Sequence, residues 1–251
     1  MNGGPLLALP EGVERVWAVP GDLLGDTFAS TTSDMRRYKR LIAAEQLDGE
    51  TAKAFDIDSD FMATRRWEYG YAVEMLWQSY GRTGGSPLRV LDVGCGYRPF
   101  TLFLASLSLR LTESRRRLVA VGEGRTLEVW ALDNESWETK EPLADRLAPR
   151  GIHFVHGDMT AMTFAGEMFD AVFAISVFEH LLREDLQSAL SECLRVLRPG
   201  GILVATVDAC QKVKALVPEG EPPADVIRTQ GGRPVAGCLV RKVWRGGHGS
   251  A

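Results

Sequence analysis

Apolar residues along this chain fall into two patterns that alternate with each other. Short runs at 90–93, 169–175 and 202–207 are almost wholly apolar, which is typical of strands buried on both faces of a sheet. Between such runs, apolar residues recur three and four positions apart, as on the buried side of a helix. Strands that alternate with helices predict an α/β fold, in which a mostly parallel, twisted sheet carries helices on both faces.

The same patterns predict the individual elements of this fold. We expect strands at 90–93, 118–121, 126–132, 152–156, 169–175, 202–207 and 234–244. We expect helices at 34–46, 61–80, 102–111, 137–147 and 186–197. The strands at 118–121 and 126–132 are separated by Gly122, Glu123 and Gly124, a composition typical of a turn that joins two paired strands.

The chain divides near residue 87 in this prediction. Residues 1–87 form an N-terminal segment, irregular through residue 33, and then a helical lid. Residues 88–251 form the core, with an insertion at about 112–127. Because the tail offers one clear strand, we expect the C-terminal β-hairpin of the sheet to be incomplete, or a partner to supply an edge.

Composition and charge narrow the classes of function. Of 251 residues, 45 % are hydrophobic and 25 % are charged, which is ordinary for a soluble globular protein. A net charge of −4 gives no broad cationic surface, which argues against nucleic acid as a partner. The four cysteines lack metal-ligand spacing, so we expect no metal site and the reduced thiols of a cytoplasmic protein. No apolar run reaches the roughly 20 residues that cross a bilayer, so we expect no membrane partner.

The stretch at 88–101, LRVLDVGCGYRPFT, holds the first candidate site. A buried strand runs into Gly94, Cys95 and Gly96, where the glycines can adopt positive φ and leave no Cβ between the backbone and a ligand. A helix-compatible segment follows from Phe100, so backbone N–H groups at this turn would face a ligand. Glycine turns of this kind occur in dinucleotide-binding folds and in folds that bind a methyl donor.

Four segments in order make the chain resemble the class I S-adenosylmethionine-dependent methyltransferases, a family with a Rossmann-like fold. They are VLDVGCG, VWALDNES, HFVHGDMT, and FDAVFAISVFEHL with its sequel ECLRVLRPGGILVATV. The resemblance covers about residues 88–208. Within the family, the chain is similar to the branch that acts on small molecules. Arg98 stands where the family often has a third glycine. Pro99 stands where a nicotinamide fingerprint requires Gly or Ala, which argues against that cofactor.

The resemblance implies S-adenosylmethionine as the cofactor and assigns its binding to ten residues. They are Asp92, Gly94, Cys95, Gly96, Asp133, Asn134, Asp158, Met159, Ile175 and Ser176. In this assignment Asp133 accepts hydrogen bonds from the ribose hydroxyls, and Asp158 accepts one from the adenine amino group. The alternative is that both aspartates cap the helices that follow them. The 37 residues from Gly96 to Asp133 exceed the roughly 20 of a plain βαβ unit, which requires the insertion.

Two further positions concern the reaction. The resemblance implies His180 as the catalytic residue, a base that removes a proton from the acceptor, and the alternative is packing or capping at a helix start. Arg65 and Arg66 precede the first core strand, and a guanidinium there could reach the donor's carboxylate. On one helix the two lie about 100° apart, so one is expected to face the site, with a surface salt bridge as the alternative.

The predicted function is transfer of a methyl group from S-adenosylmethionine to a small-molecule acceptor by in-line displacement. The enzyme would contribute chiefly by positioning the two reactants. One alternative is a protein or RNA methyltransferase that docks through the N-terminal region and the arginines at 115–117. Another is a non-catalytic homologue that binds adenosylmethionine and keeps the fold. The sequence leaves the acceptor and the oligomeric state open.

Overall fold

The fold comes from a computed structural model of the chain. The structure describes residues 13–19, 21, 33–34, 36, 62–82, 85–96, 100–107, 109–111, 118–120, 126–134, 151–229 and 231–242. These ranges contain a central sheet, helices packed against it, and the strand ends that form the candidate site. No helix within them has both the length and the apolar character needed to cross a membrane.

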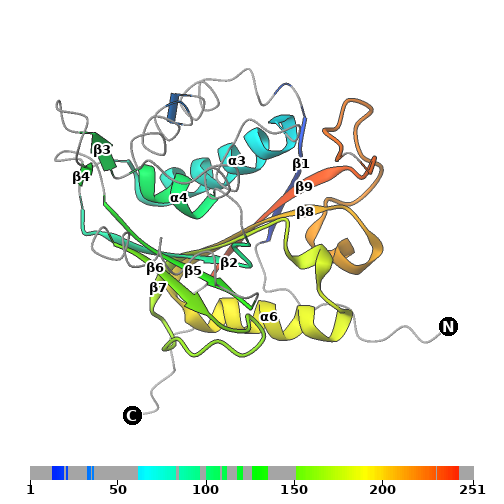
Figure 1. Ribbon diagram of the computed structural model, residues 1–251. Helices are drawn as coiled ribbons and strands as arrows, with labels where there is room; N and C mark the ends of the chain where they lie inside the picture. The colour runs from blue at the N-terminus through cyan, green and yellow to red at the C-terminus, as the bar shows by residue number, and fades with distance from the viewer. Residues whose placement is uncertain are drawn as a thin grey trace, which may run out of the picture.

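A seven-stranded sheet forms the centre of the molecule, in the strand order β1-β9-β8-β7-β2-β5-β6 (Figure 1). In chain order its strands are β1 (Glu14–Trp17), β2 (Leu88–Val93), β5 (Leu127–Asp133), β6 (Ile152–His156), β7 (Phe169–Ile175), β8 (Leu197–Asp208) and β9 (Val235–Arg241). The five strands from β8 to β6 pair in parallel with one another. This mostly parallel sheet confirms the predicted fold class.

The direction in which strands are added to the sheet reverses at β2. The next strands along the chain, β5 and β6, lie on one side of β2, whereas β7 and β8 lie on the other. Asp92 of β2 is level with Ala131 of β5 and Phe173 of β7, so these strands end at the same edge. A reversal of this kind leaves a crevice beyond the carboxyl ends of the parallel strands, where ligands of open α/β sheets bind.

Helices cover both faces of the sheet (Figure 1). They are α3 (Met62–Tyr80), α4 (Phe100–Ser106), α6 (Arg183–Val196) and the 3-10 helices η3 (Phe178–His180) and η4 (Gln211–Leu216). α3 and α4 pack on one face around an apolar core that includes Trp67 and Phe103. α6 and η4 pack on the other face around a core that includes Leu190 and Leu216. The helix predicted at 186–197 is therefore confirmed as α6.

α3 lies close against the sheet because glycine occupies the contact point. Trp67 and Tyr71 stack with ring centroids 5.0 Å apart. Both rings lie over Gly237 of β9, where an added Cβ would come within 2.5 Å of the Tyr71 ring. The helix ends at Tyr80, and the next residue, Gly81, has a φ of 72° and donates its N–H to the carbonyl of Trp77 at 2.8 Å. These bounds confirm the helix predicted at 61–80.

The edge of the sheet is completed from the N-terminal end of the chain. β9 runs antiparallel to β8, and β1 runs antiparallel to β9, with Val16 level with Gly237. The prediction that residues 1–33 are irregular is wrong at Glu14–Trp17, and this strand lies where the sequence left an edge to a partner. Four residues with one apolar pair are too short for a periodic signal, and their partner strand lies far along the chain.

The segment after α4 also differs from the prediction. The helix predicted at 102–111 ends at Ser106, and residues Leu109–Leu111 form strand β3 instead. β3 pairs antiparallel with β4 (Leu118–Ala120) in a separate two-stranded sheet, so the predicted pairing of 118–121 with 126–132 is wrong. Leucine, serine and arginine alternate from Leu107 to Leu111, a period of two that favours a strand over a helix.

The other strands predicted for the sheet are confirmed to within a few residues: 90–93, 126–132, 152–156, 169–175, 202–207 and 234–244. The helices predicted at 34–46 and 137–147 fall outside the described residues or almost entirely so, as do the arginines at 115–117. The division of the chain near residue 87 stays a prediction, although β1 from the first part pairs within the central sheet.

Candidate ligand-binding site

A cavity of about 640 Å³ lies beyond the carboxyl ends of β7, β2, β5 and β6, at the position where the order of the strands reverses. Its walls are formed by Gly94, Gly96, Leu132, Asp133, Asn134, Gly157, Asp158, Met159, Ser176, Val177, His180 and Leu181. Eight of the residues proposed from the sequence are among them, from four separate strand ends. A volume of this size is in the range of sites that hold cofactors and drug-sized ligands.

Gly94 shapes the floor of the cavity because no larger residue fits there. Its φ is 63°, and an added Cβ would lie 2.6 Å from a methyl carbon of Val177 and 3.0 Å from the terminal methyl of Met159. Its N–H donates to the carbonyl of Leu132 at 2.8 Å. The turn therefore needs both the conformational freedom and the missing side chain of glycine.

Asp133 closes the other side of this turn. It ends β5, is almost completely buried, and accepts a hydrogen bond from the backbone N–H of Gly96 at 2.5 Å. A charge-assisted hydrogen bond of this kind is stronger than one between neutral groups. The glycine turn and the acidic strand end are therefore one unit of the cavity wall. Asn134 follows at the exposed rim, where its carbonyl oxygen lies 3.1 Å from Nε2 of His156.

Asp158 lies at the exposed end of β6, beside Met159. Its Oδ1 accepts the N–H of Thr160 at 2.8 Å, which fixes the turn after the strand. Asp158 therefore caps a turn, which is close to the alternative role proposed for it. Its carboxylate lines the cavity as well. The helix that Asp133 was proposed to cap lies outside the described residues.

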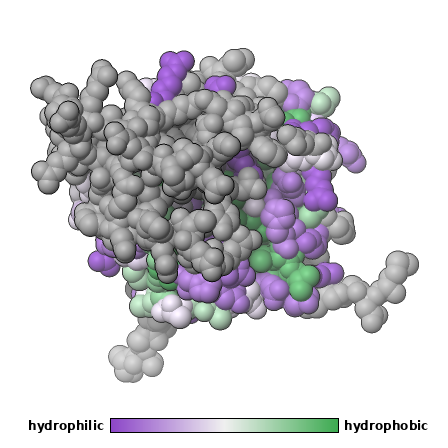
Figure 2. All heavy atoms as spheres, viewed as in Figure 1, coloured by the Kyte–Doolittle hydropathy of each residue, from purple (hydrophilic) through white to green (hydrophobic). Residues whose placement is uncertain are grey.

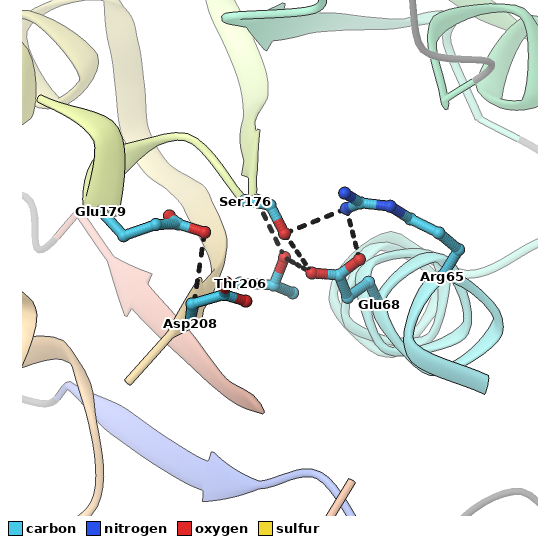
Figure 3. A network of polar contacts seen from close by, with 6 residues as sticks. All are labelled: Arg65, Glu68, Ser176, Glu179, Thr206 and Asp208. Carbon is cyan, nitrogen blue, oxygen red and sulfur yellow. Dashed lines mark hydrogen bonds and ion pairs between the residues drawn. The ribbon is translucent and has the colours of Figure 1, made fainter. Parts of the chain in front are cut away.

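The end of β7 is held by a set of polar side chains that we call the Glu68 network, namely Arg65, Glu68, Ser176 and Thr206 (Figure 3). Glu68 of α3 has no solvent exposure and accepts hydrogen bonds from the hydroxyls of Ser176 and Thr206. Arg65 donates to Glu68 at 2.5 Å and to the hydroxyl of Ser176 at 2.9 Å. Arg65 therefore reaches the end of β7 through Ser176, whereas its predicted contact with the donor's carboxylate stays a prediction.

His180 and its neighbours form a further part of the cavity wall. His180 ends η3, is exposed, and lines the cavity, and within the part of the chain that is described its ring has no hydrogen-bond partner. Leu181 lines the cavity beside it, and Leu182 is 62 % exposed. Figure 2 shows apolar side chains gathered on the surface over the segment between β7 and α6, among hydrophilic ones.

Glu179 is buried behind this wall rather than inside the cavity. One of its carboxylate oxygens accepts the N–H of Asp208 at 3.2 Å, and the other has no hydrogen-bond partner among the described residues. Burial raises the pKa of Glu179 to about 7, the N–H of Asp208 opposes this shift, and the nearby charges of Asp208 and Glu68 add to it. A carboxyl that titrates near neutral pH therefore lies next to the Glu68 network (Figure 3).

Three residues proposed from the sequence do not line the cavity. Asp92 is buried in β2 and accepts a hydrogen bond from the Thr101 hydroxyl at 2.6 Å, which ties the strand to α4. Cys95 is buried under the turn, and Ile175 is buried at the end of β7. These three support the cavity from below, and their roles toward a ligand stay predictions.

Sequence patterns missed two buried members of the Glu68 network, Glu68 itself and Thr206. Glu68 stands between Trp67 and Tyr69 in a helix with an aromatic face, and a carboxylate in such a place requires a partner. That signal was present in the sequence, but the partner could not be named because Ser176 lies 108 positions away. Among the described residues, no group of three or more His, Cys, Asp or Glu side chains is arranged to hold a metal ion.

Comparison with known proteins gives one family match and several similar curated proteins. Residues 91–205 match the family described as "Methyltransferase domain". The chain is 31 % identical over 155 residues to malonyl-[acyl-carrier protein] O-methyltransferase of Methylococcus capsulatus. The aligned region covers 62 % of this chain and 49 % of that protein. It is 30 % identical over 144 residues to ubiquinone biosynthesis O-methyltransferase of Dinoroseobacter shibae, which covers 54 % of this chain and 49 % of that protein. The chain thus spans about half the length of these curated relatives.

Among solved structures, the chain is similar to 1,6-didemethyltoxoflavin-N1-methyltransferase of Burkholderia thailandensis, with a TM-score of 0.49 and 17 % identity over 92 % of this chain and 96 % of that one. The region that matches the methyltransferase family, residues 91–205, begins in β2 and ends in β8. It therefore contains all four strand ends that line the cavity. The match over residues 91–205 and these relatives support the prediction that this is an S-adenosylmethionine-dependent methyltransferase of class I.

Proposed function

We propose that this chain binds S-adenosylmethionine in the cavity at the ends of β2, β5, β6 and β7 and transfers its methyl group to a small-molecule acceptor. The observation that carries this proposal is the 2.5 Å hydrogen bond between the Gly96 N–H and Asp133, which joins a glycine turn to a buried carboxylate in one wall. A cavity floor that excludes a Cβ at Gly94 fits a ligand that approaches the backbone closely.

The residues of the cavity suit the separate parts of the donor. Asp133 would accept hydrogen bonds from the ribose hydroxyls, since a carboxylate has more acceptor positions than the one that Gly96 occupies. Asp158 and Met159 would hold the adenine, through a hydrogen bond and through packing on the ring. Gly94 and Ser176 would flank the methionine portion. Arg65 supplies a positive charge beside Ser176, within the same network.

The donor supplies an electrophilic methyl group that is already activated by its sulfonium charge. The protein therefore needs to hold the acceptor in line with that group and to exclude water. Val177 and Leu181 line the cavity with apolar side chains on this side, which supports an acceptor with an apolar portion. Both relatives described above are O-methyltransferases. A carboxylate acceptor is already ionised, but an acceptor that reacts through a hydroxyl group must lose a proton. That requirement gives His180, exposed in the cavity wall, the role of base.

A methyltransferase acting on protein or RNA is the alternative from another class of acceptor. The arginines at 115–117 that motivated it lie outside the described residues. The acidic net charge of −4 disfavours a long phosphate backbone. A small acceptor is favoured because the cavity of about 640 Å³ leaves limited volume beyond a bound donor.

Two measurements test the proposal in sequence. Calorimetry with S-adenosylmethionine and with its demethylated product should show binding to the purified chain, and the absence of binding would contradict the proposal. Incubation with methyl-labelled donor should then be carried out on separated cell-extract fractions of metabolites, protein and RNA. Label that enters the metabolite fraction supports a small-molecule acceptor, whereas label in protein or RNA supports the alternative. Donor binding without transfer to any fraction would favour a non-catalytic homologue.

A further inference from the structure

The Glu68 network joins a helix from the N-terminal part of the chain to the cavity. Glu68 and Arg65 lie on α3, whereas Ser176 follows β7 and Thr206 lies in β8 (Figure 3). Oε1 of Glu68 accepts both hydroxyls, and Oε2 accepts Arg65 at 2.5 Å. In a site without solvent, each of these hydrogen bonds is costly to lose, because the remaining partner is left buried and unpaired.

Of the four residues in the Glu68 network, Ser176 alone is among those that line the cavity. Its φ is 53°, a left-handed conformation that serine rarely adopts. Its N–H donates both to the carbonyl of Thr206 at 2.9 Å and to the hydroxyl of Thr206 at 3.2 Å. Its own hydroxyl donates to Glu68 and accepts from Arg65 at 2.9 Å. Backbone and side chain of Ser176 are thus both fixed.

A strained residue persists when its surroundings determine its conformation, and such residues cluster at ligand-binding sites. Here the determining groups are Glu68 and Thr206, which are fully buried and do not line the cavity. An effect of these two side chains on a ligand is therefore indirect, through the partners that they hold, Ser176 and Arg65. That separation makes the role of the network measurable apart from direct contact.

We propose that Glu68 is a positioning residue for donor binding, which holds the turn at Ser176 through its hydroxyl partners and makes α3 part of the donor site. This inference rests on the proposed function, because it requires that the cavity binds the methyl donor. The coupling is reciprocal: if α3 stabilises the turn that contacts the donor, then the donor stabilises α3. Donor binding should therefore slow the amide hydrogen exchange of α3 around Arg65 and Glu68.

The pair Thr206→Val and Thr206→Ser tests the proposal. Valine keeps the shape of threonine but removes the hydroxyl that joins Glu68 to the N–H of Ser176, whereas serine keeps the hydroxyl and loses a methyl group. Affinity for S-adenosylhomocysteine, measured by calorimetry, should fall about tenfold in Thr206→Val and stay near the wild-type value in Thr206→Ser. The slowing of exchange in α3 on ligand binding should likewise weaken in Thr206→Val.

Glu68→Gln provides a second variant if Thr206→Val fails to fold. Its amide keeps an oxygen for the two hydroxyls but removes the charge that pairs with Arg65, and we again expect about tenfold weaker binding. The matched control is Glu74→Gln on the same helix, where the carboxylate accepts a hydrogen bond from Gln78 at 2.8 Å. This control should bind as the wild type does, because Glu74 does not contact the Glu68 network.

The outcomes separate this inference from the proposed function. Wild-type binding with unchanged affinity in both Thr206→Val and Glu68→Gln would overturn the positioning role and leave the proposed function in place. Equal loss in Thr206→Ser and Thr206→Val would also overturn it, because packing rather than the hydroxyl would then be responsible. A wild-type chain that binds neither the donor nor its product would overturn both. Loss in Thr206→Val with recovery in Thr206→Ser is the result that supports it.

Discussion

The backbone N–H of Gly96 donates a 2.5 Å hydrogen bond to Oδ2 of Asp133, across 37 positions of sequence. This bond connects the ends of β2 and β5, which are neighbouring parallel strands in the sheet. It shows how a glycine turn and an acidic strand end that are far apart in the sequence form one wall of the cavity. Replacing Asp133 should therefore affect both the glycine turn and the binding of a ligand.

Asp133→Ala should weaken the binding of S-adenosylmethionine by roughly 1–3 kcal/mol, the range for losing hydrogen bonds to a charged group. The loss has two sources, since the variant removes an acceptor for the ribose hydroxyls and also removes the carboxylate that binds the Gly96 N–H. Asp133→Asn is the matched control, because it keeps one oxygen and should bind with intermediate affinity. Calorimetry that gives unchanged affinity for Asp133→Ala would mean that another acidic residue holds the ribose.

Gly94→Ala should lower both the stability of the fold and the affinity for the donor. The added Cβ would lie 2.6 Å from Val177 and 3.0 Å from Met159, and overpacking of this kind costs about 1–3 kcal/mol. Gly200→Ala is the control, because Gly200 also has a positive φ, of 77°, yet has open space where its Cβ would lie. Thermal unfolding should show a smaller loss for Gly200→Ala, and calorimetry should show donor affinity unchanged. Equal effects of the two variants would mean that backbone conformation, and not the contact with Val177, is responsible.

The parallel core of the fold could be predicted from the sequence because its strands are buried on both faces. Such strands appear as continuous apolar runs, as at Phe169–Ile175, where all seven residues are buried. β1 could not be predicted in this way. Its four residues are mostly exposed, and they are held by pairing with β9, a contact between the two ends of the described chain. A strand that is held mainly by pairing with another strand shows little apolar pattern in its own sequence.

The residues of the candidate site likewise differ in whether the sequence could predict them. Gly94 and Asp133 stand directly after apolar runs, so their positions at the edge of the sheet follow from the pattern. Glu68 and Thr206 are buried inside elements, where sequence shows a polar residue but not the partner that it meets. Their hydrogen bonds depend on the way that α3 lies over β8, a tertiary contact that no local pattern encodes.

His180→Ala should reduce turnover by about 10²–10⁴-fold if the imidazole removes the acceptor's proton, while donor affinity stays nearly constant. Turnover of the wild type should also increase as the pH is raised, because a base acts only in its unprotonated form. His153→Ala is the control, because His153 stacks on Trp130 and pairs with Glu128 at 3.5 Å, outside the cavity wall. A flat pH profile with little change in His180→Ala would mean that catalysis rests on positioning.

The buried carboxyl of Glu179 should make the stability of the fold depend on pH. Its pKa is raised from 4.5 to about 7, chiefly because burial disfavours the charged form. Between these two values the folded chain retains the proton while the unfolded chain releases it. The free energy of unfolding should therefore be highest, with respect to this group, below pH 4.5, and should fall as pH rises to about 7. Glu68 and Asp208, the acidic groups that face it, act in the same direction.

Glu179→Gln tests this because an amide carries no charge at any pH and can still accept the N–H of Asp208. The variant should be close to the wild type in stability near pH 5 and more stable than the wild type near pH 8, by up to about 3 kcal/mol. Denaturant unfolding at a series of pH values measures this difference, with Glu219→Gln at an exposed position as the control. A constant difference between variant and wild type across the series would contradict the assignment, because the proton held by Glu179 would then not be linked to folding. A difference that grows with pH would show that Glu179, next to the network that holds Ser176, keeps its proton on folding.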